Sequence, residues 1–386
     1  MIKIAILTAT RAEYGLMRPL IAGMKEDAEI DLRLLVTGTH LSEQFGMTYT
    51  EIEADGNEIA EKIDILSNRT GAVGVSETMG HALVKFTEYF EKDKPDFLVI
   101  DGDRYEALAV AIAATNCNIP IVHLGGGETT QGATDECYRH AITKMSLLHF
   151  VSNESYRKRV IQMGENPNFV KVVGSVSLEN IRLMKFLHKE QLEEYLDFKL
   201  DKPYVVVTFH PVTLEDDTAE KQVKELLKAC EKRKNIKFIF TKANADRGGE
   251  QINRLLEAFA VEHPNQMKCV ASLGSVRYLS ALKYCAFVLG NSSSGITEAP
   301  SFGIPTVNIG DRQKGRIQAE SILNCEPTRQ AISQCIDRAL DLDFRQKCRE
   351  VKNPNGDGYT SSRIIAEIKK VYNNGEINLK KKFFDI

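Results

Sequence analysis

Short apolar segments alternate with helical patterns along most of this 386-residue chain, and this alternation limits the folds that it can adopt. Alternating strands and helices predict a parallel sheet that is covered by helices on both faces. In the first half we expect strands at 2–7, 32–36, 97–100, 119–122, 148–151 and 170–173, and helices at 13–25, 77–91, 104–115, 135–145 and 153–163.

The alternation pauses at 177–200, a charged helical stretch, and then resumes. We expect further strands at 204–209, 236–240, 268–271, 286–289 and 306–309, with helices at 219–232, 247–258, 276–284 and 296–302. The pattern therefore predicts an α/β protein of two doubly wound Rossmann-like domains, 1–175 and 176–360. In the remaining segment, 361–386, a helix at 361–372 is expected to cross back to the first domain, before a solvated Lys-rich tail.

Composition excludes several classes of protein. The chain is 43% hydrophobic and 27% charged, as is typical of soluble globular proteins. A net charge of −3 gives no reason to expect nucleic acid or a membrane surface as a partner. No apolar run has the length of a membrane span, and residues 1–7 look like a strand, not a secretory signal. Eight cysteines without a Cys-x-x-Cys pair predict reduced thiols in the cytoplasm.

A hydroxyl-rich turn follows the expected strand at 286–289. It reads Gly290-Asn291-Ser292-Ser293-Ser294-Gly295, and Glu298 follows one helical turn later. Such a turn at the start of a helix offers free backbone N–H groups to a phosphate. Glu298 could accept hydrogen bonds from ribose hydroxyls. The stretch indicates a sugar-nucleotide site, and the alternative is a capped strand-to-helix turn without a ligand.

Carboxylates follow two neighbouring strands of the first half. Asp101 and Asp103 come after the strand at 97–100, while Glu128 and Asp135 come after the strand at 119–122 and three glycines. Clustered carboxylates raise one another's pKa and can act by turns as acid and base. Asp101 and Asp103 could instead hold a divalent metal, or one of them could cap a helix. Arg139 and His140 fit surface ion pairs better than a site.

Other polar residues also follow strands. Arg11 and Arg312 are candidates for phosphate binding. His210, before a rigid proline, could transfer a proton or contact a phosphate. Tyr278 could stack on a base or belong to the core. The chain lacks a P-loop, a Gly-x-Gly-x-x-Gly turn after the first strand, a Gly-x-Ser-x-Gly elbow and a His/Cys cluster, so ATPase, nicotinamide, flavin and zinc sites are not expected.

Several motifs occur together and in order, and the set resembles the hydrolysing UDP-N-acetylglucosamine 2-epimerases, in the branch that makes N-acetylmannosamine for sialic acid. The motifs are Thr10-Arg11-Ala12-Glu13, Asp101-Gly102-Asp103, His123 to Glu128, Arg139-His140-Ala141-Ile142-Thr143-Lys144, His210-Pro211-Val212-Thr213 and Gly290 to Gly295. The resemblance covers about residues 1–370. It implies a glycosyltransferase-B-like fold with a ligand cleft between the domains, a UDP-sugar substrate, no metal, no other cofactor, and a homodimer.

The resemblance also implies a reaction, in which UDP is eliminated across C1 and C2 to give 2-acetamidoglucal. Water then adds with inversion at C2, releasing N-acetylmannosamine and UDP. By position, the implied proton-transfer residues are Asp103 and Asp135, with His210 also required. The implied nucleotide contacts are Arg11, Asn244, Tyr278, Asn291, Ser292, Ser293, Gly295, Glu298 and Arg312.

One position departs from the family pattern. Many members have a catalytic Glu two residues after the histidine that matches His123, and here that position is Gly125. Either Glu128 takes over the role, or the acid–base scheme differs. Relatives that act on UDP-N,N'-diacetylbacillosamine, for legionaminic acid, share the same framework, so that substrate is the alternative. A glycosyltransferase and a non-catalytic sugar-nucleotide binder are alternatives of other classes.

Overall fold

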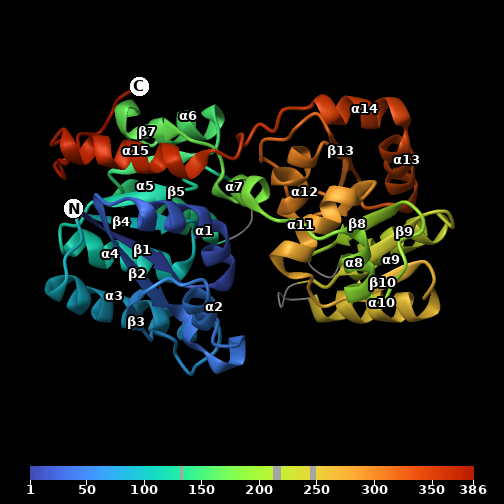
Figure 1. The fold of residues 1–386 in the computed structure, drawn as a ribbon, viewed down its shortest axis with the longest axis horizontal. Helices are drawn as coiled ribbons and strands as arrows, with labels where there is room; N and C mark the ends of the chain where they lie inside the picture. The colour runs from blue at the N-terminus through green and yellow to red at the C-terminus, as the bar shows by residue number, and fades with distance from the viewer. Residues whose placement is uncertain (131–133, 212–218, 244–248) are drawn as a thin grey trace. The chain divides into compact units, whose positions relative to one another are not determined.

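The computed structural model describes residues 1–130, 134–211, 219–243 and 249–386. The chain forms two compact units, each built around its own parallel sheet (Figure 1). The first unit contains Met1–Glu128, Thr134–Arg182 and Asn355–Ile386, and the second consists chiefly of Leu183–Pro354. The expected fold class, two Rossmann-like domains of the glycosyltransferase-B type, is confirmed.

The sheet of the first unit has seven parallel strands in the order β3-β2-β1-β4-β5-β6-β7. The strands are β1 (Ile2–Thr8), β2 (Ile30–Thr37), β3 (Ile59–Ile63), β4 (Phe97–Asp101), β5 (Ile121–Leu124), β6 (Leu148–Val151) and β7 (Val170–Val172). The helices are α1 (Arg11–Glu26), α2 (Tyr49–Ala54), α3 (Gly71–Lys92), α4 (Tyr105–Asn116), α5 (Asp135–Met145), α6 (Glu154–Gln162), α7 (Val176–Leu183), α15 (Thr360–Asn373) and the 3-10 turns η1 (Gly38–Leu41), η2 (Glu43–Phe45) and η3 (Pro167–Phe169).

Two cores lie on opposite faces of this sheet, because successive side chains of a strand point to opposite sides. Ile4 and Ile6 of β1 pack with side chains of α1 and α15. Ala5 and Leu7, which alternate with them, pack with side chains of α3 and α4. Helix α15 follows the whole second unit in sequence, yet it packs against α1 of the first unit.

The sheet of the second unit has six parallel strands in the order β10-β9-β8-β11-β12-β13. The strands are β8 (Tyr204–Thr208), β9 (Lys237–Thr241), β10 (Met267–Val270), β11 (Phe287–Gly290), β12 (Thr306–Ile309) and β13 (Ile322–Cys325). The helices are α8 (Lys189–Leu196), α9 (Ala219–Glu231), α10 (Gly249–Glu262), α11 (Gly274–Tyr284), α12 (Ser293–Thr297), η4 (Ala299–Phe302), α13 (Arg329–Leu340) and α14 (Leu342–Glu350).

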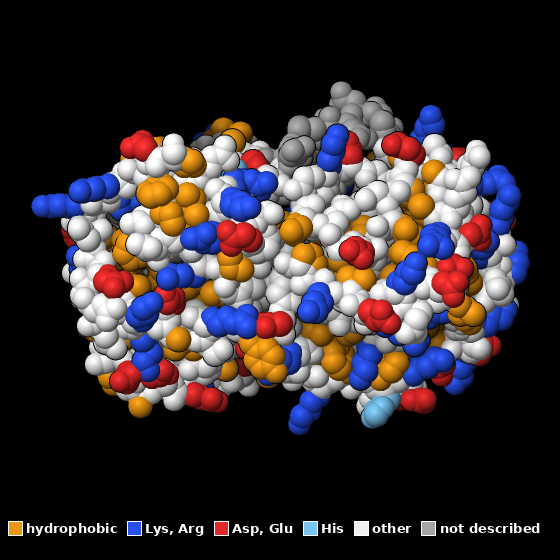
Figure 2. All heavy atoms as spheres, turned by 90° about the horizontal axis from the view of Figure 1, so that it is seen from above, with side chains coloured by type: hydrophobic (Ala, Val, Ile, Leu, Met, Phe, Trp, Pro, Cys, Tyr) orange, Lys and Arg blue, Asp and Glu red, His pale blue; other side chains and the backbone are white. Residues whose placement is uncertain are grey.

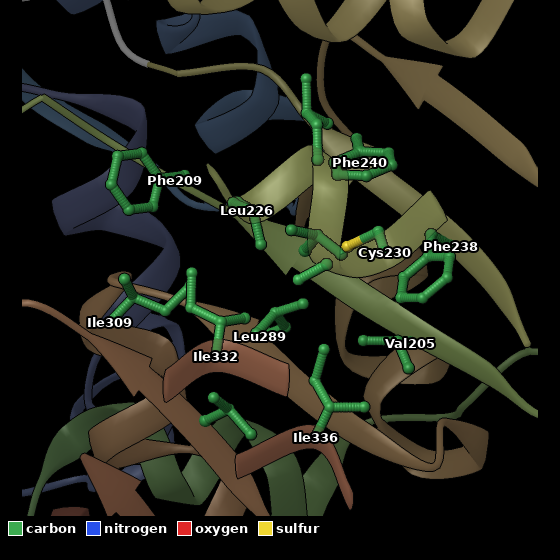
Figure 3. Close-up of a cluster of buried hydrophobic side chains, with 14 of the residues drawn as sticks. Val205, Phe209, Leu226, Cys230, Phe238, Phe240, Leu289, Ile309, Ile332 and Ile336 are labelled. Atoms are coloured by element: carbon green, nitrogen blue, oxygen red, sulfur yellow. The ribbon is translucent and has the colours of Figure 1, made fainter. Parts of the chain in front are cut away.

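The main core of the second unit lies between β8, β9, β11 and β12 and the helices α9 and α13. Figure 3 shows Leu226 and Cys230 of α9 and Ile332 and Ile336 of α13 beside strand residues such as Val205. These side chains are completely or almost completely buried. The apolar face of each helix therefore covers the apolar strands that the sequence predicts.

The structure contains two strands that the sequence analysis did not predict. Strands β3 and β13 each form an edge of a sheet. Their side chains are only partly buried, and β3 contains Glu61 and Lys62. Edge strands tolerate charged residues, so neither strand has the continuous apolar pattern of a central strand. The helix expected at 296–302 is also divided, since α12 ends at Thr297 and η4 begins at Ala299, before Pro300.

The C-terminal tail is exposed, as expected of a solvated end, but two of its residues also make contacts with the first unit. Lys381 inserts its ammonium group among acceptors of the first unit, and the backbone N–H of Phe384 donates to the carbonyl of Gly164. Elsewhere the surface is mixed, and basic and acidic side chains are interspersed on the face in Figure 2. Among the described residues no helix has both the length and the apolar character of a membrane span.

Truncation of a core side chain should destabilise the second unit. We expect Leu226→Ala to lower its free energy of unfolding by about 2–5 kcal/mol, because the cavity cannot close completely. Leu342→Ala is the matched control, since Leu342 is 77% exposed and its truncation should change stability little. Urea unfolding measures both variants, and equal stabilities would contradict the packing described for this core.

Candidate functional site

The acidic residues of the first unit gather where β4 and β5 end. Asp101 is the last residue of β4, and the backbone N–H of Gly102 donates to the carbonyl of Leu124, the last residue of β5. This hydrogen bond ties the segment that leads to Asp103 to the end of the neighbouring strand. Burial raises the pKa of Asp101 well above its usual range, and the negative charges of Glu13, Glu128 and Asp103 add to the increase.

Arg139 of α5 connects these acids. The sequence analysis did not predict this role for Arg139. Its side chain is 3% exposed and forms ion pairs with Asp103 and with Glu136, 2.8 Å away. It also donates to the backbone carbonyl of Glu128 at 3.0 Å. The interpretation of Arg139 as a surface residue was wrong. A buried guanidinium needs charged or polar partners on several sides, and α5, the segment after β4 and the glycine loop provide them.

Asp135 stands at the first position of α5, one helical turn before Arg139. Burial raises the pKa of its carboxyl group, and the charge of Asp103 raises it further, against the opposing effects of Arg104 and Arg139. Asp135 thus keeps its proton to a higher pH than an ordinary aspartate. The structure brings Asp103, Asp135 and the backbone of Glu128 together around one arginine.

His123 is fixed inside the first unit. It is fully buried, its Nε2 lies 2.8 Å from the carbonyl of Gly102, and its Nδ1 lies 3.1 Å from the hydroxyl of Thr143. Burial lowers its pKa to about 3, so the ring is neutral at physiological pH. In this geometry His123 joins β5 to β4 and α5.

Gly125, the position of the departure from the family pattern, has a φ of +80°. L-residues rarely adopt this conformation, whereas glycine adopts it at low cost. A glutamate at this position would therefore strain the loop as it is built here. This chain therefore differs from the family pattern in two ways at this position: it lacks the acid, and its backbone has a conformation that favours glycine.

Two further acids of the first unit, Glu13 and Glu106, lie near the same arginine, Arg104. Glu13 accepts hydrogen bonds from the backbone N–H groups of Ala9 and Thr10 and completes a capping box at the start of α1. Burial raises its pKa to about 7, although the hydrogen bond from Ala9 opposes this. Arg104 lies 3.9 Å from Glu13 and 2.6 Å from the buried Glu106. The neighbouring Arg11 is largely exposed at the start of the same helix, 3.9 Å from Glu51.

Three polar side chains, those of Asn291, Arg312 and Gln313, connect the segments that follow the strands of the second unit. The side-chain oxygen of Asn291 accepts from the backbone N–H of His210 at 2.7 Å, and its amide donates to the carbonyl of His210 at 2.8 Å. Arg312 and Gln313 both donate to the carbonyl of Asn291, at 3.2 and 2.9 Å. Burial lowers the pKa of His210 to about 4, and the charge of Arg312 contributes, so the imidazole is neutral at pH 7.

The hydroxyl-rich turn has the capped geometry that the sequence predicts. The Ser292 side chain accepts from the backbone N–H of Ser294 and caps α12, which includes Ser293 and Gly295. The hydroxyl of Ser294 donates a hydrogen bond to the carboxylate of Glu298. Burial raises the pKa of Glu298, and this hydrogen bond partly opposes the increase. Burial raises the pKa of the Tyr278 hydroxyl in α11, and the nearby Glu298 carboxylate raises it further.

Three predicted positions lie outside the described residues. They are Asn244, a predicted nucleotide contact, and Val212 and Thr213 of the motif that follows His210. Of the remaining candidates, the structure groups Asp103, Glu128 and Asp135 in the first unit. It groups His210, Asn291 and Arg312, and also Tyr278 and Glu298, in the second. Among the described residues no cluster of His, Cys, Asp and Glu has the geometry of a metal site.

Comparison with known proteins shows the family to which this chain belongs. The sequence matches the profile of the UDP-N-acetylglucosamine 2-epimerase family over residues 22–369. The chain belongs to this family.

Two relatives are similar to this chain over most of their length. The GDP/UDP-N,N'-diacetylbacillosamine 2-epimerase (hydrolyzing) of Campylobacter jejuni is 42% identical over 384 residues, which cover 100% of this chain and 99% of the relative. Polysialic acid biosynthesis protein P7 of Escherichia coli is 40% identical over 353 residues, which cover 91% of this chain and 90% of the relative. The structure of a Neisseria meningitidis UDP-GlcNAc 2-epimerase bound to UDP-GlcNAc, 18% identical, has a TM-score of 0.82 over 96% of this chain and all of its own, which shows the common fold.

The buried Glu13 should make the stability of this 2-epimerase family member depend on pH. Its pKa in the folded state, about 7, exceeds that of an unfolded glutamate, so the folded state binds the proton more tightly. The stabilisation is complete below the unfolded pKa and is lost as the pH rises through about 7. The free energy of unfolding of the unmodified protein should therefore fall between pH 5 and pH 8. In Glu13→Gln this fall should be smaller by about 2 kcal/mol.

Urea unfolding at the two pH values measures this difference. Glu26→Gln, on the exposed face near the end of the same helix, is the control and should behave like the unmodified protein. An identical loss of stability in the Glu13→Gln variant would show that Glu13 is ionised in the folded state across this range.

Proposed function

We propose that this chain is a hydrolysing 2-epimerase whose substrate is a nucleoside-diphosphate-linked N,N'-diacetylbacillosamine. The observation that carries this proposal is the 42% identity over the whole chain to a protein named for that activity. The glycine at position 125 supports it, because the positive φ of this loop disfavours the acid that many UDP-N-acetylglucosamine enzymes have there. The substrate differs from N-acetylglucosamine at C4 and C6, so a changed loop beside the sugar is reasonable.

The proposed reaction requires proton transfers at C2 and at water. A base removes the C2 proton while the bond between C1 and the diphosphate oxygen breaks, which forms a C1–C2 double bond and releases the nucleoside diphosphate. An acid then returns a proton to the other face of C2, and a base removes a proton from the water that adds to C1. Two or more carboxyl groups with different proton affinities suit these steps.

We assign the proton transfers to the acids around Arg139. Asp135 has a raised pKa and suits the acid that protonates C2. Asp103, held as an ion pair with Arg139, suits a base. Glu128 is the candidate to replace the acid that is missing at Gly125.

We assign nucleotide binding to the second unit, with a contribution from Arg11. The turn at Ser292 and Ser293, with Arg312, would contact the diphosphate, and Glu298 would accept hydrogen bonds from the ribose. His210 has a lowered pKa, so it would act as a neutral donor or acceptor near the leaving group and not as a fixed cation. Asn244 and Tyr278 would complete the nucleotide site.

A second candidate substrate is UDP-N-acetylglucosamine. The similarity to the Escherichia coli polysialic acid protein favours it, because N-acetylmannosamine, the product of this reaction, is the sugar from which sialic acid is made. The same carboxylates would carry out the same elimination and hydration. The two candidates therefore differ in the sugar and not in the chemistry.

The substrate can be tested with four sugar nucleotides: the UDP and GDP derivatives of N-acetylglucosamine and of N,N'-diacetylbacillosamine. Each is incubated with the purified protein, without an acceptor and with EDTA, and the release of UDP or GDP is measured. We expect a diacetylbacillosamine nucleotide to give the highest kcat/KM. A preference for UDP-N-acetylglucosamine would support the second candidate, and dependence on an added acceptor or metal would contradict both.

Replacement of the proposed acid should impair the chemical step. We expect Asp135→Asn to lower kcat by about 10²–10⁴-fold, the usual contribution of a general acid or base. KM should change much less, because the nucleotide contacts are elsewhere. Asp343→Asn, at an exposed aspartate in the first turn of α14, is the matched control and should keep full activity. Unchanged kcat in Asp135→Asn would remove Asp135 from the proton-transfer scheme.

A further inference from the structure

The C-terminal tail of the chain is anchored in the first unit. After α15 the chain turns back toward α6 (Figure 1), where the N–H of Phe384 donates to the carbonyl of Gly164 at 3.0 Å. The ring of Phe383 lies against Gly164 and leaves no room for a Cβ atom at that position. The ammonium group of Lys144, in α5, also lies over the Phe383 ring, 5.0 Å from its centre.

Lys381 of the tail caps the end of α5. Its ammonium group donates to the carbonyl of Lys144 at 2.9 Å and to that of Ser146 at 2.6 Å. Lys144 is in the last turn of α5, and Ser146 is its C-cap residue. The last carbonyls of a helix have no partner within the helix, and the helix dipole favours a positive charge there. A residue more than 230 positions away in sequence therefore supplies the cap.

A buried carboxylate completes the binding site for Lys381. Glu165 is 1% exposed, and its two oxygens contact Lys144 at 2.6 Å, His149 at 3.0 Å and Lys381 at 2.5 Å. Burial alone would raise the pKa of Glu165, but the hydrogen bonds from His149, Lys144 and Lys381 lower it to about 2. Removal of the Lys381 ammonium would leave this buried negative charge with fewer donors, which is costly in a protein interior.

The other end of α5 carries the acid–base residues of the proposed function. Asp135 and Arg139 lie in the first half of this 11-residue helix, and Lys381 holds the residues that follow its last turn. A helix of this length spans about 16 Å and moves largely as one body. Arg139 in turn contacts Asp103 and the carbonyl of Glu128, so a shift of α5 would disturb all three.

We propose that Lys381 is a positioning residue for the 2-epimerase reaction: the C-terminal tail clamps α5 from behind and so sets the geometry of Asp135, Arg139 and Asp103. The proposal rests on the proposed function for its catalytic consequence. Its structural part, the clamp on α5, stands on the contacts of Lys381 alone. Loss of the clamp should lower kcat and leave KM nearly unchanged, because the proposed nucleotide contacts of the second unit do not involve α5.

Four variants test the proposal. Lys381→Met removes the charge and keeps much of the length of the side chain, and Lys381→Arg retains a cation. Removal of residues 380–386 deletes the whole tail anchor. Lys382→Met, one position along, is the matched control, because no hydrogen bond or ion pair of Lys382 is seen in the described structure. Thermal unfolding of each variant shows that assays are made on folded protein.

We expect Lys381→Met and the truncation to lower kcat by about 3- to 30-fold, a range typical of small misplacements of catalytic groups, with KM within about twofold. Lys381→Arg and Lys382→Met should match the unmodified protein. Amide hydrogen exchange in residues 135–146 should become faster in Lys381→Met and in the truncated protein, and should stay unchanged in Lys382→Met.

The outcomes separate the two proposals. If the unmodified protein is inactive on all four sugar nucleotides, the proposed function fails, and hydrogen exchange alone decides on the clamp. If the unmodified protein is active and Lys381→Met has the same kcat, the positioning role is wrong. An equal loss of kcat in Lys382→Met, or a rise in KM that matches the fall in kcat, would also overturn it. If Lys381→Met does not fold, the truncated protein, compared with Lys382→Met, gives the same test.

Discussion

The strand pairs of both sheets are parallel, and the placement of the acids in the first unit and of His210 and Asn291 in the second depends on this constraint. Parallel strands end at one edge of a sheet, so the residues that follow different strands meet there. In the first unit, the hydrogen bond from Gly102 to Leu124 joins the segments that carry Asp103 and Glu128. In the second unit, Asn291 after β11 is bonded to His210 after β8.

Within the first unit, charge balance explains why the acids can lie so close together. Carboxylates in a buried setting repel one another and resist ionisation unless a cation is present. Arg139 supplies that cation to Asp103 and Glu136, whereas Asp101 and Asp135 have raised pKa values. The cluster thus combines an acid paired with a cation and acids whose pKa values are raised, and a reaction with separate acid and base steps needs groups that differ in this way. The tail contributes by holding the helix that carries the arginine.

The central strands and most helices could be predicted because burial leaves a periodic apolar pattern in the sequence. The edge strands β3 and β13 could not, since partly exposed strands carry polar residues such as Glu61 and Lys62. The clustering of Asp103, Glu128 and Asp135 followed from their places after neighbouring strands. The roles of Arg139 and Lys381 depend on contacts with residues distant in sequence, and local pattern contains no signal for such contacts. For Arg139, the weak clue was a cation in a helix that begins with two acids.

The central claim is that acids of the first unit exchange a proton with C2 of the sugar during elimination and hydration. Proton NMR of the products formed in heavy water tests it most directly, with the diacetylbacillosamine nucleotide as substrate. The account predicts a free sugar with inverted configuration at C2 and one deuterium at that carbon, together with the nucleoside diphosphate. A product that retains the original hydrogen at C2, or the original configuration, would contradict it.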